Sequence, residues 1–203
     1  MNLTKRSCIA LVATTVLFGG CAATGGGGSW QTLVDGGKGL DNFNPIGDAN
    51  WRAEGGAIVA DKGKGGFLVT KQSYGDFEIR AEFWADDTTN SGIFIRMSDR
   101  TTVNPQNAYE VNIYDRRPDP TYATGGIVDV AKVNVAYKAA GKWNTMVITA
   151  RGDQFVIVLN GVETSKGSNA KHAAGPFALQ FGAGPEGSAL GSIKWRKVQV
   201  RAL

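Results

Sequence analysis

The sequence predicts an all-β fold, a jelly-roll-like sandwich of two antiparallel sheets. About a dozen short apolar stretches are separated by glycine-containing turns, several alternate with period two, and none has a convincing helical period. Glycine accounts for 28 of the 203 residues and charged residues for only 20%, which suits many tight turns better than a helical bundle. The length is sufficient for one well-buried domain.

The N-terminus is predicted to be a leader that is not part of the fold. Lys5 and Arg6 precede an apolar run over residues 8–18, which is too short to span a membrane and is typical of a secretory signal. Small residues then precede Cys21, and this pattern resembles the cleavage site of bacterial lipoproteins. A plain signal peptide with an incidental cysteine is the alternative. We expect a signal peptide at 1–20, a glycine-rich tether at 21–29 and one domain at 30–203.

Acylation of Cys21 would anchor the protein in the cell envelope, at the outer membrane or in the periplasm. The lipid would be its only contact with the membrane. Ala22, the residue after the cysteine, resembles the signal for outer-membrane sorting. Because Cys8 leaves with the leader and Cys21 carries lipid, the mature domain would contain no disulfide and no cysteine metal site.

The mature domain is close to neutral. Loss of Lys5 and Arg6 lowers the formal net charge from +4 to +2. A nucleic-acid partner is not expected, because phosphate binding needs clustered lysine and arginine. The densest basic group lies at 194–201, and we interpret it as a solvated strand face.

The expected strands can be placed in order. Short apolar runs bounded by glycine predict the first three, and strict alternation places Glu78, Arg80, Glu82 and Trp84 on the exposed face of the fourth. Asn160-Gly161 is a strong hairpin signal, and a break in the alternation at 196–197 indicates a bulge in the last strand. The predicted strands are 30–35, 57–60, 67–70, 76–84, 91–97, 109–115, 142–152, 154–161, 175–181 and 193–201.

The candidate site lies in two of these strands, 91–97 and 109–115. Period-two alternation places Ile93, Ile95 and Met97 on the buried face of the first, and Tyr109, Val111 and Ile113 on the buried face of the second. Paired side by side, the strands would bring Arg96, Glu110 and Asn112 together on the opposite face, with Asp115 just past the end. The connection over 114–142 is long enough to build one wall of a site.

Six motifs, in this order, resemble the 3-keto-disaccharide hydrolase domain family. They are NSGIFIR (90–96), YEVNIYD (109–115), TGGI (124–127), WN (143–144), LNG (159–161) and GSIKWRKVQV (191–200). The resemblance implies a concanavalin-like jelly roll that acts on a carbohydrate, namely a glycoside already oxidised to a ketone at carbon 3. It also implies an alternative, because some members of the family look like non-catalytic carbohydrate-binding modules.

Such a ketone makes the hydrogen on carbon 2 acidic, so that the glycosidic oxygen on carbon 1 can leave by β-elimination and water can then add. Glu110 is the expected base and Arg96 the expected partner of the enolate oxygen. A divalent cation held by Glu110, Asp115 and Glu82 could serve the enolate instead, and oxygen ligands suit Ca²⁺, Mg²⁺ or Mn²⁺. We expect Asn90, Asn112 and Tyr114 to bind hydroxyl groups and Trp84 to stack on the sugar ring.

Two departures from the family pattern bear on the mechanism. The family commonly has glutamine where this chain has Asn112, and a histidine often precedes the TGGI motif where Tyr122-Ala123 stands here. The only histidine, His172, is interpreted as a surface residue. An ordinary two-carboxylate glycosidase and a purely structural role also stay open, although Glu110 and Asp115 fall on opposite parities of their strand.

Overall fold

The computed structural model describes residues 27–182 and 191–203. The leader, Cys21 and most of the tether expected at the N-terminus lie outside these residues. No helix of the described part is long and apolar enough to cross a membrane.

The regular secondary structure of the described chain consists of strands and two single turns of 3-10 helix. The strands are β1 (Gln31–Asp35), β2 (Phe43–Gly47), β3 (Arg52–Glu54), β4 (Ala57–Ala60), β5 (Gly66–Thr70), β6 (Phe77–Ala85), β7 (Ser91–Ile95), β8 (Tyr109–Ile113), β9 (Trp143–Arg151), β10 (Gln154–Leu159), β11 (Val162–Ser168), β12 (Ala178–Phe181) and β13 (Ile193–Ala202). The turns are η1 (Leu40–Asn42) and η2 (Pro120–Tyr122). The predicted all-β fold is therefore confirmed.

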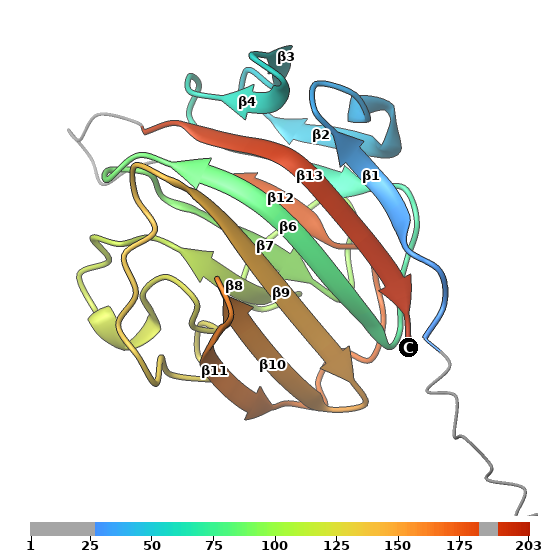
Figure 1. Ribbon diagram of the computed structural model, residues 1–203. Coiled ribbons are helices and arrows are strands. Elements are labelled where there is room, and N and C mark those ends of the chain that lie inside the picture. Colours follow the sequence, from blue (N-terminus) through green and yellow to red (C-terminus); the bar gives the residue numbers. More distant parts are fainter. Residues whose placement is uncertain (1–26, 183–190) are drawn as a thin grey trace, which may run out of the picture.

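The strands form two antiparallel sheets that pack face to face (Figure 1). The larger sheet has eight strands in the order β11-β10-β9-β6-β13-β4-β3, with β1 also paired to β13. The smaller sheet has five strands in the order β2-β5-β12-β7-β8. The expected bulge near residues 196–197 is confirmed, because the register of β13 against β6 shifts between Trp195 and Lys197.

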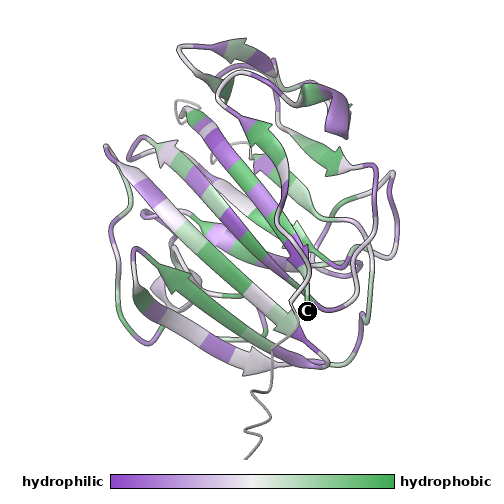
Figure 2. Cartoon of the chain, turned by 45° about the vertical axis from the view of Figure 1, so that its right-hand side comes forward, coloured by the Kyte–Doolittle hydropathy of each residue, from purple (hydrophilic) through white to green (hydrophobic). Residues whose placement is uncertain are grey.

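Period-two alternation explains which side chains lie between the sheets. Hydrophobic and hydrophilic bands alternate along the strands (Figure 2), and β6 buries every second residue while its intervening side chains face solvent. The core contains Phe83, Trp195, Phe155 and Leu179, all fully buried. This core fixes the register of both sheets, because a slip by one residue would expose it.

The five-stranded sheet has a second apolar cluster on its outer face. Phe94, Val69 and Ala178 form its centre, and Met97 and Val103 from the loop after β7 pack against them. Both faces of β7 and β8 are consequently buried. The loop over 98–107 thus shields part of a sheet face that would otherwise lie open to solvent.

Candidate active site

Glu110 projects from β8 onto the outer face of the five-stranded sheet. Its cross-strand partner is Phe94 of β7, and only 8% of Glu110 is exposed. The expectation that Glu110 and Asn112 face away from the core is therefore confirmed.

Gly92 allows two polar side chains from different strands to approach each other. A Cβ atom at this glycine would lie 3.5 Å from Cγ of Glu110 and 3.4 Å from Oε1 of Gln180. It would also lie 2.9 Å from the carbonyl oxygen of Val111, so no larger residue fits without a shift. The carboxyl group of Glu110 on β8 and the amide group of Gln180 on β12 therefore lie on either side of Gly92, which has no side chain.

The environment of Glu110 favours its protonated form. Burial is the main cause that raises its pKa from 4.5 to about 7, and Asp129 raises it further. Arg117 opposes this by stabilising the carboxylate. A carboxyl group with a pKa near 7 can act as either acid or base at neutral pH.

Arg117 and Asp129 both lie in the long loop over 114–142 that follows β8. It folds back on its own strand, since the Val128 amide donates to the Glu110 carbonyl at 3.0 Å and the Asn112 amide donates to the Gly126 carbonyl at 2.9 Å. The loop also contains the turn η2. The loop therefore lies beside β8, and its expected role as one wall of a site stays a prediction.

Several buried polar atoms of the described residues lack a hydrogen-bond partner. Three of them belong to this region: Oδ1 of Asn112, Nε of Arg117 and Oε1 of Gln180. Buried polar atoms are usually satisfied, so each exception calls for an explanation, and an absent ligand or water is one. Their proximity to Glu110 marks this face as the candidate site.

A hollow of about 380 Å³ opens beside Gln180 on the same face. We call it the Gln180 hollow. It is lined by Ile46, Gly47, Lys64, Gly65, Gly66, Phe67, Thr101, Thr102, Val103, Gln180, Phe181 and Gly182. Strands β2, β5 and β12 provide its floor and the loop over 98–107 provides one wall.

Arg96 does not belong to this site, and its expected pairing with Glu110 is wrong. The residue has a φ of 52°, which interrupts the alternation and turns its side chain between the two sheets. There the guanidinium donates to the carbonyls of Gly75 and Gly152 and to Asp76 Oδ1. Met97, expected in the main core, joins the outer cluster for the same reason.

Asp115 is engaged in holding the long loop. Its Oδ1 accepts from Thr124 Oγ1 at 2.6 Å, and its Oδ2 accepts from the amides of Ala139 and Ala140 at 2.8 and 2.9 Å. The expected cation site at Glu110 and Asp115 therefore does not fit, because Asp115 would have to release these donors. Among the described residues, no group of three or more histidine, cysteine or acidic side chains could hold a metal.

Glu82 and Trp84 lie on the outer face of the opposite sheet, so their expected place near Glu110 is wrong. Glu82 pairs with Arg196 at 2.5 Å, and the Lys194 ammonium lies 4.6 Å from the Trp84 ring centroid. Strand β6 neighbours β9 and β13, not β7.

The remaining expected sugar ligands have different positions. Asn112 is fully buried and donates to the Tyr122 carbonyl at 2.6 Å, so it braces the loop over 120–126 instead of facing solvent. Tyr114 follows β8 and is also buried. Asn90 lies beside Gly182 at the edge of the Gln180 hollow, where its carbonyl accepts from the glycine amide at 2.8 Å.

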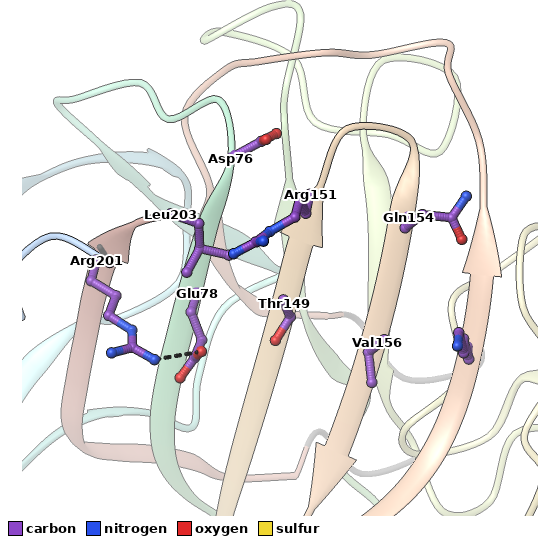
Figure 3. A pocket seen from close by; sticks show the side chains of 10 residues that line it. Asp76, Glu78, Thr149, Arg151, Gln154, Val156, Arg201 and Leu203 are labelled. Atoms are coloured by element: carbon purple, nitrogen blue, oxygen red, sulfur yellow. Dashed lines mark hydrogen bonds and ion pairs between the residues drawn. The ribbon is translucent and has the colours of Figure 1, made fainter. Parts of the chain in front are cut away.

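A larger hollow, about 710 Å³, lies on the eight-stranded sheet and not on this face. Figure 3 shows its wide, open floor, on which Glu78 pairs with Arg201 beside Thr149 and Val156. Unsatisfied atoms do not decide between the two hollows, because Gln180 Oε1 lines the smaller one and Arg201 Nε belongs to a residue that lines the larger one. The raised pKa of Glu110, which lies across Gly92 from Gln180, favours the smaller hollow, because strongly shifted groups gather at functional sites.

This architecture defines a class: jelly-roll domains of the lectin type, here with a buried carboxylic acid on the outer face of one sheet. A family model of the 3-keto-alpha-glucoside-1,2-lyase-like domain matches residues 29–201. The chain belongs to this family, as the sequence motifs predicted. A comparison with curated proteins gives no match.

Solved structures share the fold. A candidate glycosyl hydrolase from Parabacteroides distasonis has a TM-score of 0.69 at 26% identity, over 86% of this chain and all of that one. The carbohydrate-binding module CBM66 from Bacillus subtilis scores 0.58 at 13% identity, over 85% and 95%. Winged bean acidic lectin, complexed with methyl-alpha-D-galactose, scores 0.62 at 12% identity, over 85% and 97%. The family and the 26% identical neighbour support a carbohydrate-related function, and the two more distant neighbours show the shared fold.

Sequence reasoning missed Gln180, Arg117 and Asp129 as members of the site. Arg117 could have been suspected, because it lies in the loop that was expected to form a wall. Gln180 shares no motif with Glu110, and only the order of strands β12-β7-β8 brings them together. No local signal in the sequence specifies that order.

Proposed function

We propose that the protein cleaves 3-keto-glycosides by β-elimination followed by hydration, with Glu110 as the base. The observation that carries this proposal is a buried carboxyl group with a pKa of about 7 on a sheet face that also contains the Gln180 hollow. Membership of the lyase-like family supports the same reaction.

The reaction needs one group that both accepts and returns a proton. The carboxylate of Glu110 takes the proton from carbon 2, and the electron pair of that bond forms the double bond between carbons 1 and 2. The bond from carbon 1 to the glycosidic oxygen breaks, and the departing oxygen takes up the proton that Glu110 removed from carbon 2. Water then adds, with its hydroxyl group on carbon 1 and its proton on carbon 2. A base with a pKa near neutral pH can both remove the proton from carbon 2 and give a proton to the departing oxygen efficiently.

Arg117 and Gln180 are the proposed partners of the substrate oxygens. Negative charge develops on the oxygen at carbon 3 when the proton leaves, and a fixed cation nearby stabilises it. Arg117 is the cation that acts on Glu110, and its buried Nε has no partner. Gln180 has an unsatisfied oxygen beside Gly92, where it could accept a hydrogen bond from a substrate hydroxyl group. Neither role depends on Arg96.

We further propose that the domain works in the cell envelope, anchored by lipid on Cys21. The basic residues, apolar run and small residues that precede this cysteine support the proposal. Metabolic labelling with a clickable fatty acid tests it, since Cys21→Ser should abolish the label.

Sugar binding without catalysis is the second candidate function. The similarity of the fold to CBM66 and to a sugar-bound lectin favours it. In that case Glu110 would accept hydrogen bonds from sugar hydroxyls, and no bond of the glycoside would break.

The two candidates separate in one experiment on a 3-keto-glucoside. We expect the protein to release the alcohol, and we expect Glu110→Gln to bind the substrate while releasing none. Glu78→Gln, on the outer face of the other sheet, is the matched control and should keep full turnover. Binding without release by the unchanged protein would favour the second candidate.

A further inference from the structure

The Gln180 hollow is lined mainly by apolar and glycine residues. Ile46, Phe67 and Val103 supply its apolar surface, and all three pack against the outer cluster. Phe67 is held edge-on against Phe94, with ring centroids 5.3 Å apart. Phe94 is also the cross-strand neighbour of Glu110. It therefore connects Phe67, which lines the hollow, with the proposed base.

The wall of the hollow is fixed by its own hydrogen bonds. Asp99 Oδ1 accepts from both the amide and the hydroxyl of Thr101 at 2.8 Å, and Asn107 Nδ2 donates to the Thr102 carbonyl. Arg100 ties the same loop to the Thr70 carbonyl at 2.9 Å. A wall held in this way binds a ligand with little loss of conformational entropy.

Strand spacing places the hollow where the leaving group of a bound glycoside would lie. Neighbouring strands are about 4.8 Å apart, and the order is β8-β7-β12-β5-β2. A sugar bound above Gly92 would touch Glu110 on β8, and the next two strands across carry Gln180 and Phe67. The hollow is therefore within about 10 Å of Gly92, which matches a group attached to carbon 1, next to the carbon that loses its proton.

We propose that the Gln180 hollow is the subsite for the leaving alcohol and that it selects an apolar, flat alcohol over a second sugar. This inference rests on the proposed function of Glu110. A second sugar would present several hydroxyl groups, but no acidic residue lines the hollow, and its only polar side chains are those of Lys64, Thr101, Thr102 and Gln180. An aromatic alcohol would instead cover Phe67 and Val103 and remove their surface from water.

The test compares two 3-keto-glucosides of the same anomer, the methyl and the 2-phenylethyl derivative. Both release simple primary alcohols, so their difference is mainly apolar size. We expect kcat/KM to be at least about tenfold higher for the 2-phenylethyl compound, since a hydrophobic pocket discriminates by such factors. Val103→Ser should reduce this preference about fivefold, mainly by lowering kcat/KM for the 2-phenylethyl compound.

Val162→Ser is the matched control, because Val162 is 40% exposed on β11 of the other sheet. It should leave the preference unchanged. Phe67 is kept intact, since its loss would disturb its packing on Phe94. Equal kcat/KM values for both compounds, or a preference that Val103→Ser leaves intact, would overturn the inference.

A binding measurement separates this inference from the proposed function. If neither 3-keto compound is cleaved, the proposed reaction is wrong. Calorimetry then compares the affinities of the unoxidised methyl and 2-phenylethyl glucosides and tests whether the hollow binds the apolar group. Tighter binding of the 2-phenylethyl glucoside, weakened by Val103→Ser, supports the subsite. Equal affinities reject it.

Discussion

Arg96 and Glu110 come from neighbouring segments of one sheet, yet their side chains lie on opposite faces of it. Arg96 is 1% exposed and inserts between the sheets, where its guanidinium lies 5.4 Å from the Phe155 ring centroid. Glu110 faces outward beside Phe94. Arg96, whose backbone is left-handed directly after β7, is therefore a structural residue, whereas Glu110 is the proposed catalytic base.

Arg96→Met should destabilise the fold. It removes hydrogen bonds to the backbone carbonyls of Gly75 and Gly152 and the 3.0 Å ion pair with Asp76, and the loss of hydrogen bonds from a charged group costs about 2 kcal/mol. Urea unfolding measures the effect. Arg151→Met, at an exposed arginine of β9, is the control and should change the free energy of unfolding by less than about 0.5 kcal/mol. Equal effects of both variants would show that Arg96 is not a structural residue.

Glu110→Gln should stabilise the protein at pH 8 and not at pH 4. The folded-state pKa of about 7 exceeds the ordinary 4.5, so ionisation of Glu110 opposes folding as pH rises through this interval. Relative to the unchanged protein, the variant should gain about 3 kcal/mol between pH 4 and pH 8. Denaturant unfolding at both values measures the gain. A variant that is less stable at pH 8 would contradict the burial of an unpaired carboxylate.

The pH dependence of turnover should report the same group. Only the carboxylate can accept the proton from carbon 2, so kcat/KM should rise about tenfold per pH unit below pH 7 and level off above it. A profile that is flat between pH 5 and pH 8 would exclude Glu110 as the base.

Two charge-removing variants should shift this profile in opposite directions. Arg117 lowers the pKa of Glu110 and Asp129 raises it. Arg117→Gln should therefore move the acid limb to higher pH, and Asp129→Asn should move it to lower pH. Shifts of the same sign would mean that these residues do not act through the charge of Glu110.

Removal of divalent cations should leave turnover unchanged. The oxygens of Asp115 already accept from Thr124, Ala139 and Ala140, and a cation would compete with these donors. Assays before and after dialysis against a chelator provide the test. Activity that is lost on dialysis and restored by Ca²⁺, Mg²⁺ or Mn²⁺ would bring back the metal site first expected at Glu110 and Asp115.

Much of the fold could be predicted because alternation in β6 and the Asn160-Gly161 turn are local signals. The direction of Glu110 followed from the same alternation. The direction of Arg96 did not, because a positive φ at a residue other than glycine has no clear sequence signal. Trp84 was predicted in the wrong place and Gln180 was not predicted at all. Both depend on the order of strands in the sheets, which is set by packing across the whole chain.

The most direct test of the account follows hydrogen at carbon 2 while a 3-keto-glucoside is cleaved in deuterium oxide. Elimination and hydration should place solvent deuterium on carbon 2 of the released sugar, faster than exchange without protein, and Glu110→Gln should yield neither alcohol nor added deuterium. Cleavage that leaves the original hydrogen on carbon 2 would contradict the account, because direct hydrolysis at carbon 1 does not disturb that bond.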